Sequence, residues 1–307
     1  MSNYKIPQLP FNTELETKVV LKKLAQAHRA LAELKGVAET IPNDTILINT
    51  LSLQEAKDSS AIENIITTHD ELYRADAMSK QFASIASKEV HSYAVALRKG
   101  FEIVKQHGIL SNNHILQIQS TIEDNDAGFR KLSGTALKND KTGEVVYTPP
   151  QHPQEIIDLM SNLEKFINDN TLCDWDALVK MAVVHHQFES IHPFYDGNGR
   201  TGRIINILYL VKEGLLKIPI LYLSRYINQN KADYYKLLQK VRTDNAWQDW
   251  VLFILNGVEQ TALQTIQQIQ GIKVLMQKHK QKLRTELPKI YSQDILNNIF
   301  RHPYTKI

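Results

Sequence analysis

Apolar residues recur every three or four positions along almost the whole of this 307-residue chain, and this spacing constrains the fold more than any other feature. Such spacing is typical of α-helices that bury one face. It predicts a first helix over about 14–36, capped by Thr13, and a second running from Asn43 toward Asn64. The expected fold class is therefore all-α. Further helices are predicted near 86–107, 112–121, 153–168, 174–190, 197–213, 231–241, 246–278 and 291–300.

One segment departs from the helical pattern. Glycines and prolines punctuate residues 134–150, and the run Val145-Val146-Tyr147-Thr148 lies between them. This combination is typical of a β-hairpin, with residues 139–143 forming its tip. Because a lone hairpin is only marginally stable, we expect this one to rest on the helices or on a bound partner. The sequence thus predicts a small β-hairpin flap on a helical body.

Composition restricts the class of protein. Hydrophobic residues make up 43% and charged residues 22% of the chain, and the formal net charge is only +3. These values are typical of a globular domain and favour neither a nucleic-acid binder nor a membrane-surface protein. Cys173 is the only cysteine, which excludes intrachain disulfides and fits a reducing compartment. With neither a secretory pattern nor an apolar run of membrane-spanning length, we expect a soluble, cytoplasmic protein without a membrane partner.

The segment His192–Arg203 carries the most chemistry. It combines a histidine, an aspartate, three glycines and two arginines directly before the apolar run 204–211. The glycines therefore open a buried helix, where backbone N–H groups can face an anion. Arg200 and Arg203 lie three positions apart, so both can grip phosphate oxygens from one helix face. Asp196 suits Mg²⁺, which takes one or two carboxylates beside substrate phosphates.

Three histidines offer a different interpretation of the same region. His185 and His186 invite a metal site together with His192. However, no spacing of histidines and carboxylates on one helix matches a zinc-site pattern. We therefore favour the phosphate site.

The segment resembles the signature His-x-Phe-x-Asp/Glu-Gly-Asn-Gly-Arg-x-x-Arg of the Fic family, and the resemblance extends over roughly residues 10–280. Family members with this unmodified pattern transfer AMP from ATP to a Ser, Thr or Tyr hydroxyl of a protein. The resemblance implies a predominantly helical Fic fold and a magnesium-dependent adenylyltransferase that acts on a protein substrate.

The resemblance also implies a role for each residue of the signature. His192 would be the general base, Asp196 the metal ligand and Phe194 the anchor of the loop. A tyrosine pair after the motif helix would line the adenosine pocket through Tyr235, whereas Arg242 stands where relatives carry a further asparagine. The residues assigned to ATP are Glu63, Gly197, Asn198, Gly199, Arg200, Thr201, Gly202, Arg203 and Tyr235.

A second motif lies near the amino terminus. Ser59, Glu63 and Asn64 occupy the defining positions of the inhibitory motif Ser/Thr-x-x-x-Glu-Gly/Asn found in relatives. Taken alone, the pattern also describes an ordinary helix end with a C-terminal Asn. Beside the Fic signature it implies that Glu63 pairs with Arg203 and so competes with the γ-phosphate of ATP. Some relatives use this glutamate to remove AMP, so de-AMPylation is open as well.

The hairpin falls where relatives carry a flap that positions the target. Extended backbone over Val145, Val146, Tyr147 and Thr148 could pair with a target segment by strand addition. The alternative is a surface hairpin without a ligand, because such strands are common.

We divide the chain into an N-terminal helical region with the inhibitory motif (1–85), a Fic catalytic core (86–245) and C-terminal helices (246–307). The last residues resemble the opening of a winged helix that continues beyond the present C-terminus. A second hypothesis is therefore a DNA-associated regulatory protein that uses the Fic core as a nucleotide sensor. A third is a Fic transferase that uses another nucleotide. Self-modification and a homodimer are also open.

Overall fold

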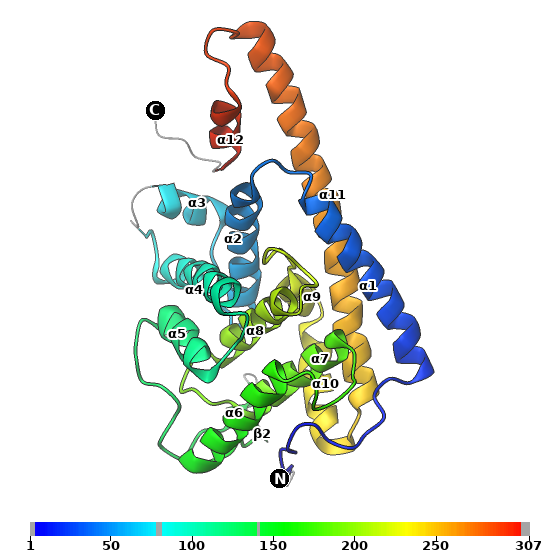
Figure 1. Ribbon diagram of the computed structural model, residues 1–307. Coiled ribbons are helices and arrows are strands. Elements are labelled where there is room, and N and C mark those ends of the chain that lie inside the picture. Colours follow the sequence, from blue (N-terminus) through cyan, green and yellow to red (C-terminus); the bar gives the residue numbers. More distant parts are fainter. Residues whose placement is uncertain (1–3, 78–81, 140–141, 302–307) are drawn as a thin grey trace.

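The computed structural model describes residues 4–77, 82–139 and 142–301. The described residues are mostly helical, and their single sheet has two strands, so the structure confirms an all-α fold with a small β-hairpin (Figure 1). The helices are α1 (Lys18–Ala38), α2 (Asp44–Ile62), α3 (His69–Ala77), α4 (Ile85–His107), α5 (Asn112–Glu123), α6 (Pro153–Asn168), α7 (Ala177–Ile191), α8 (Asn198–Lys212), α9 (Leu223–Gln229), α10 (Lys231–Asp244), α11 (Trp247–Glu286) and α12 (Gln293–Arg301).

Helices α7 and α8 form the centre of the molecule. Every residue from Leu178 to Ile191 is buried, and in α8 burial extends from Arg200 to Leu210. Helices α4 and α5 pack against α8 on one side, while α11 packs against α7 on the other (Figure 1). The apolar run predicted to form a buried helix after the glycines therefore does so. The short turn between α7 and α8 is fixed at both ends by the core.

The two ends of the chain pack together. Helix α1 lies along α11, which has 40 residues and so extends about 60 Å at 1.5 Å per residue (Figure 1). The C-terminal part of α11 projects beyond the body, and α12 folds back to contact α2. Parts of the first and third predicted regions thus lie side by side, and the division at 85 and 245 stays a prediction.

The first helix begins later than the sequence predicts. It starts at Lys18, and the Thr17 hydroxyl, not that of Thr13, accepts the hydrogen bond from the Val20 N–H. The preceding segment is irregular, and the backbone of Leu9 exchanges two hydrogen bonds of 2.8 Å with the Asn162 side chain on α6. Tertiary contacts therefore outweigh the local capping signal.

Two short helices, α3 and α9, are absent from the sequence prediction. Helix α9 has only seven residues, too few to show a full apolar repeat. In α3 the described side chains are mostly exposed or half-buried, with Leu72 the buried exception, so no apolar stripe marks it. Helix α11 also continues eight residues past the predicted end at 278, through a polar stretch.

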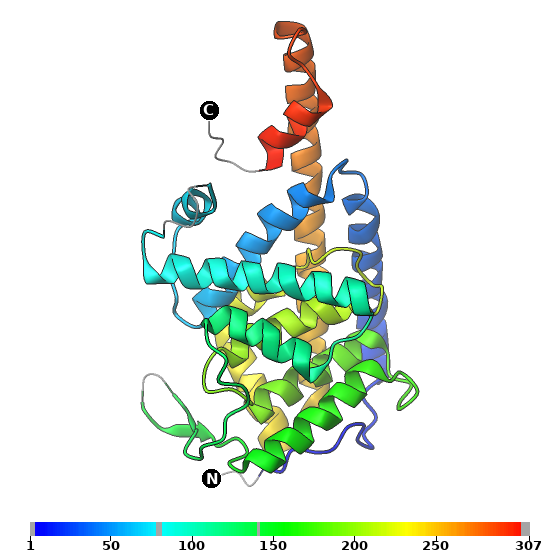
Figure 2. The ribbon, with the colours of Figure 1, turned by 60° about the vertical axis from the view of Figure 1, so that its left-hand side comes forward.

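The hairpin is present at the predicted place. Strand β1 (Leu137–Lys138) pairs antiparallel with β2 (Val145–Tyr147), with an irregularity in register within β1. The Gly143 N–H donates to the Asn139 carbonyl across the predicted tip, of which residues 140 and 141 lie outside the described residues. The hairpin stands out from the helical body in Figure 2. This element is the flap of the following sections.

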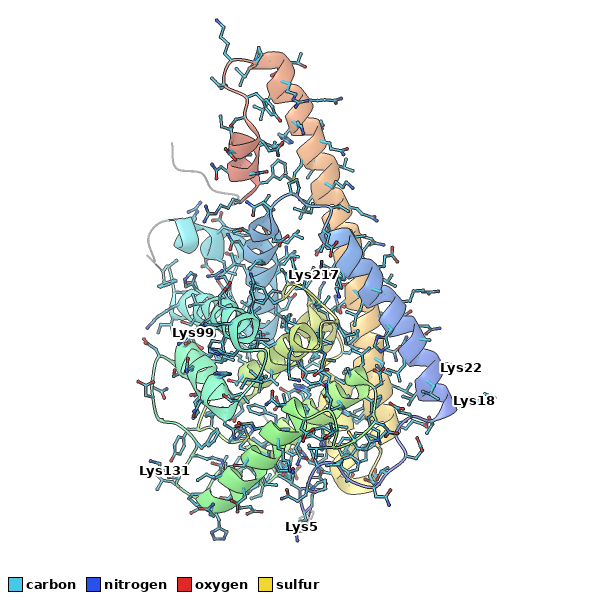
Figure 3. All side chains as sticks on the ribbon, in the orientation of Figure 1. Lys5, Lys18, Lys22, Lys99, Lys131 and Lys217 are labelled. Atoms are coloured by element: carbon cyan, nitrogen blue, oxygen red, sulfur yellow. The ribbon has the colours of Figure 1, made fainter. Side chains whose placement is uncertain are left out.

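Lysine side chains lie on separate parts of the surface. Figure 3 labels six of them, which come from the amino-terminal segment, α1, α4, the loop before β1 and the connection after α8. Within residues 4–77, 82–139 and 142–301, no helix is both long enough and apolar enough to cross a bilayer.

We expect Trp250→Ala to destabilise the protein by about 3–5 kcal/mol, because it empties a large volume in the core. The ring of Trp250 is fully buried, stacks on His185, and donates a 2.8 Å hydrogen bond to the Ala182 carbonyl. Chemical denaturation measures the loss. The control Val274→Ala changes a 65% exposed residue of the same helix, and it should shift stability by less than about 0.5 kcal/mol. Equal losses in the two variants would contradict this assignment of the core.

Candidate active site

The turn between α7 and α8 has two left-handed residues at its ends. His192 caps the C-terminus of α7 with φ 49°, and Gly197 caps the N-terminus of α8 with φ 76°. Between them the Asn198 side chain closes the loop, accepting from the Phe194 N–H at 2.8 Å and donating to the Phe194 carbonyl at 2.9 Å. Phe194 is fully buried, as predicted for the anchor. These contacts hold the turn in one conformation.

His192 sits in this turn at the edge of the core. Burial, together with the nearby positive charges of Arg130 and Arg242, lowers the pKa of its imidazole to about 4, while Glu63 acts in the opposite direction. The imidazole is therefore neutral at pH 7, the state that a general base requires.

The guanidinium of Arg203 is buried and faces α2. Its Nε donates to the Ser59 hydroxyl at 2.7 Å, and its Nη2 donates to the Ser59 carbonyl at 3.0 Å and to Glu63 Oε1 at 2.8 Å. The Arg203 side chain is 2% exposed and that of Glu63 is 36% exposed. The predicted pair is thus present, with the arginine inside and the carboxylate at the opening.

Both members of this pair are held in their charged forms. Burial alone would raise the pKa of Glu63, but the charge and hydrogen bond of Arg203 outweigh it and leave the pKa below its ordinary value. Burial alone would lower the pKa of Arg203, and Glu63 with other nearby groups raises it above normal. The ion pair therefore persists throughout the neutral pH range.

The carboxylate of Glu63 also lies against the start of α8. A Cβ added to Gly199 would overlap Glu63 Oε1 and come within 2.9 Å of Arg203 Nη1. Glycine is thus required here for the close approach of the carboxylate. The predicted anion position at this helix start is taken by a side chain of the protein itself, where the helix dipole favours negative charge.

Arg200 points elsewhere. Its Nη1 lies 3.1 Å from Glu89 Oε2, and its Nη2 lies 2.8 Å from Glu123 Oε1. The side chain is only 4% exposed. In this conformation Arg200 ties α8 to α4 and α5, and its fork is occupied by carboxylates instead of being open to a phosphate.

The other residues assigned to ATP divide into two groups. Gly197 and Gly199 lie at the helix start, where backbone N–H groups can meet an anion. By contrast, Thr201 is fully buried, and Gly202 packs so closely on Phe188 that a Cβ would come within 3.0 Å of the ring. In this conformation the side chains of Thr201 and Asn198 face the core and the loop, and the assignment of Asn198, Thr201 and Gly202 to ATP stays a prediction.

Asp196, the metal ligand expected from the sequence, directly precedes the N-cap of α8. Its side chain is exposed beside the helix start, and Oδ1 accepts a 2.7 Å hydrogen bond from the Gly197 N–H. No group of three or more metal-binding side chains occurs among the described residues. A single exposed carboxylate next to an anion position fits Mg²⁺, which completes its shell with phosphate oxygens and water.

The predicted flap residues do not share one orientation. Val145 and Val146 are 45% and 43% exposed, and Thr148 is exposed as well. Tyr147, however, is buried, and its hydroxyl donates a 2.9 Å hydrogen bond to the Ser190 carbonyl. The Tyr147 side chain therefore anchors the flap to the helical body, and docking of a target on the backbone of residues 145–148 stays a prediction.

The tyrosine expected to contact adenosine is exposed, whereas the two histidines considered as metal ligands are buried. Tyr235 is 46% exposed and packs edge-on against the buried Tyr234. His185 is buried with its Nε2 2.9 Å from the Tyr234 hydroxyl, and His186 is buried against the Leu238 carbonyl. Burial lowers the pKa of His185 to about 3. Both histidines are thus neutral core residues, and the alternative metal site with His192 is wrong.

Comparison with known families decides the identity of this arrangement. The profile described as Fic/DOC family N-terminal matches residues 21–102, and the profile described as Fic/DOC family matches residues 109–210, which include the turn. A third profile, the C-terminal domain of SoFic-like protein adenylyltransferases, matches residues 275–307. The chain belongs to the Fic/DOC family.

Curated relatives of this Fic protein carry related names. A probable protein adenylyltransferase from Aquifex aeolicus is 28% identical over 183 residues, which are 58% of this chain and 53% of that protein. The protein adenylyltransferase fic-1 from Caenorhabditis briggsae is 26% identical over 140 residues, 44% of this chain and 24% of that protein. The chain thus spans about half or less of the length of these relatives.

Solved structures agree on the fold. A Fic family protein from Desulfovibrio desulfuricans G20 superposes with a TM-score of 0.69 at 20% identity, covering 85% of this chain and 77% of that one. Fic-1 from Caenorhabditis elegans superposes with a TM-score of 0.61 at 18% identity, covering 82% and 73%. At these identities the likeness establishes the Fic fold.

Several polar groups at the site carry no signal in the sequence. Glu123 and Glu89 hold Arg200, and Arg130 contacts the His192 carbonyl from a loop 62 positions away. Glu189 is buried near Arg203, and burial raises the pKa of its carboxyl to about 7. None of these residues belongs to a motif, so only the folded structure assigns them to the site.

We expect Gly197→Ala to destabilise this Fic protein more than Gly108→Ala. Both positions have positive φ, so each substitution incurs a backbone cost of about 1–2 kcal/mol. At Gly197 a Cβ would also come within 2.5 Å of Glu123 Oε1, whereas at Gly108 nothing lies within 4 Å. Thermal unfolding of both variants measures the difference. A Gly197→Ala protein no less stable than the control would show that Glu123 does not press against the turn.

Proposed function

We propose that this Fic protein is an adenylyltransferase that moves AMP from ATP to a Ser, Thr or Tyr hydroxyl of a protein, and that Glu63 restrains it. The observation that carries the proposal is the position of Glu63 on Arg203 at the start of α8, beside a neutral His192. The names of the curated relatives support the same reaction.

The reaction assigns a task to each part of the turn. Neutral His192 takes the proton from the acceptor hydroxyl, whose oxygen forms a bond to the α-phosphorus of ATP while the bond to pyrophosphate breaks. The N–H groups at the start of α8 and the Arg203 guanidinium hold the phosphates in line. When bound at Asp196, Mg²⁺ would neutralise charge on the phosphate oxygens.

Restraint follows from competition for one guanidinium. The Nε–H and Nη2–H groups of Arg203 donate to Ser59 and Glu63 on α2, so these donors are already in use. A γ-phosphate requires the same fork, so ATP bound beside Glu63 lacks productive alignment. Because the Glu63 side chain is 36% exposed, it can leave without unfolding the core. The same carboxylate could orient water for removal of AMP, which makes de-AMPylation part of the proposal.

The nucleobase is the least constrained part of the substrate. The contacts proposed above involve only the phosphates, and the one candidate contact to the nucleobase is the exposed ring of Tyr235. We take ATP as the nucleotide because the relatives are named adenylyltransferases. Nothing observed in the described residues favours the DNA-associated alternative.

We expect Glu63→Gly to raise self-modification by at least about ten-fold, because the Arg203 fork then becomes available to the nucleotide. Intact-mass measurement after incubation with ATP and Mg²⁺ should show gains equal to AMP. Adding His192→Ala to the Glu63→Gly protein should lower its rate of self-modification by about 100-fold or more. Unchanged activity in Glu63→Gly would refute the restraint, and a gain of phosphate would refute adenylylation.

Ser59→Ala should activate the enzyme less than Glu63→Gly, on the order of a few-fold, because Arg203 loses one neutral acceptor and keeps the carboxylate. The matched control is Ser60→Ala. The Ser60 hydroxyl is equally buried, but it has no hydrogen-bond partner among the described residues. Activation of equal size in the two serine variants would mean that a general loosening of α2, and not the Arg203 contact, releases the enzyme.

A further inference from the structure

Arg130 is a buried cation whose side-chain hydrogen bonds all go to backbone carbonyls. It lies in the loop between α5 and β1 and is 1% exposed. Its Nε donates to the His192 carbonyl at 2.8 Å, and its Nη2 donates to the carbonyls of Pro150 and, at 3.3 Å, Ile191. The residue's own N–H donates to the Pro193 carbonyl at 2.8 Å. Burial of a charge is costly, and here no carboxylate among the described residues hydrogen-bonds to the guanidinium to offset that cost. We take this to mean that the site needs the planar, fixed donor geometry of the arginine.

The carbonyl acceptors belong to two separate parts of the site. Ile191 ends α7 and His192 begins the turn, whereas Pro150 lies three residues after β2 of the flap. One guanidinium therefore joins the end of the flap to the backbone of the general base. A planar fork with fixed donor directions sets the spacing of the two parts, which a flexible ammonium group cannot do.

The flap has a second attachment, to the C-terminal end of α7. The Tyr147 hydroxyl binds the Ser190 carbonyl at 2.9 Å, and the Arg242 guanidinium lies 3.8 Å over the Tyr147 ring while its Nε donates to the Ser190 hydroxyl. This attachment holds β2 to the end of α7. It does not reach His192, so the contact with the base is made by Arg130.

We propose that Arg130 is a positioning residue that fixes the flap, and with it a docked acceptor hydroxyl, relative to His192. The inference rests on the proposed transfer reaction and goes beyond the signature motif, because Arg130 lies outside that motif and touches neither nucleotide nor acceptor. A displacement of about 1 Å between acceptor and base is enough to lower a rate by about 100-fold. Arg130 thus controls the geometry of transfer without contributing to nucleotide binding.

The test compares three variants in the activated Glu63→Gly protein. Arg130→Lys keeps the charge and loses the fork, Arg130→Gln loses both, and Lys131→Gln removes a charge from the neighbouring exposed side chain as the matched control. We expect self-modification with ATP to fall at least about ten-fold in both Arg130 variants and to stay unchanged in the control. The Kd of α,β-methylene ATP should change less than about two-fold in all three.

Hydrogen exchange of the flap amides provides a readout independent of activity. Exchange over residues 142–148 should become about ten-fold faster in Arg130→Lys than in Lys131→Gln, because the hydrogen bond to Pro150 is lost or weakened. Normal flap exchange would overturn the proposal, and so would fast flap exchange with full self-modification. If the parent Glu63→Gly protein gains no AMP, the proposed function fails, while the exchange comparison still decides whether Arg130 holds the flap.

The pH dependence separates positioning from general damage. His192 faces the charges of Arg130 and Arg242, the backbone of Glu189 and, in the unmodified protein, Glu63. A positive charge favours the neutral imidazole, so Arg130→Gln should let His192 bind its proton at higher pH, and activity should be lost earlier on acidification. Arg130→Lys keeps the charge and should retain the parent acid limb. An acid limb displaced equally in both variants would contradict the role of the fork. Should Arg130→Gln fail to fold, Arg130→Lys alone decides between the outcomes through rate and exchange.

Discussion

The arrangement of the site depends on the buried guanidinium of Arg203. Its charge cannot be removed by deprotonation, and its side chain is 2% exposed, so the fold must supply an anionic or strongly polar partner. Helix α2 supplies Ser59 and Glu63. A polyphosphate would supply oxygens of the same kind at the same place. One fork cannot serve both, so under the proposed function restraint by Glu63 and alignment of the nucleotide would exclude each other.

That competition requires a rigid support. The turn from His192 to Gly197 is held between two helices buried on all sides and closed by Asn198 on the Phe194 backbone. Glu63, by contrast, caps the end of α2 with an exposed side chain. The structure thus combines a rigid turn with a carboxylate at its opening. The flap is joined to this turn through Arg130 and to the end of α7 through Tyr147, which under the proposed function would hold acceptor and nucleotide against the same support.

The sequence predicted most helices because their apolar repeats reflect burial against the core. It failed where contacts distant in the chain override local signals. Thr13 has the sequence pattern of a cap, but the irregular segment before α1 is bound to α6 through Leu9, and Thr17 caps the helix instead. Seven-residue α9 is too short to show a period. The sequence predicted the strand that contains Tyr147 but not the burial of its side chain. Which face of an isolated hairpin is covered depends on the helices beneath it.

The sequence alone predicted a phosphate site at residues 192–203 and a buried helix after it, because a histidine, a glycine turn, two arginines and the apolar run that follows are local features of the chain. It also indicated the partner of Arg203 through a second motif. Only the tertiary structure decided that Glu63, 140 positions away, reaches Arg203, that Arg200 is held by Glu123, and that Arg130 joins the flap to His192. The physical reason is that local spacing sets the direction of a side chain from its own helix, whereas its partner is set by the packing of separate helices.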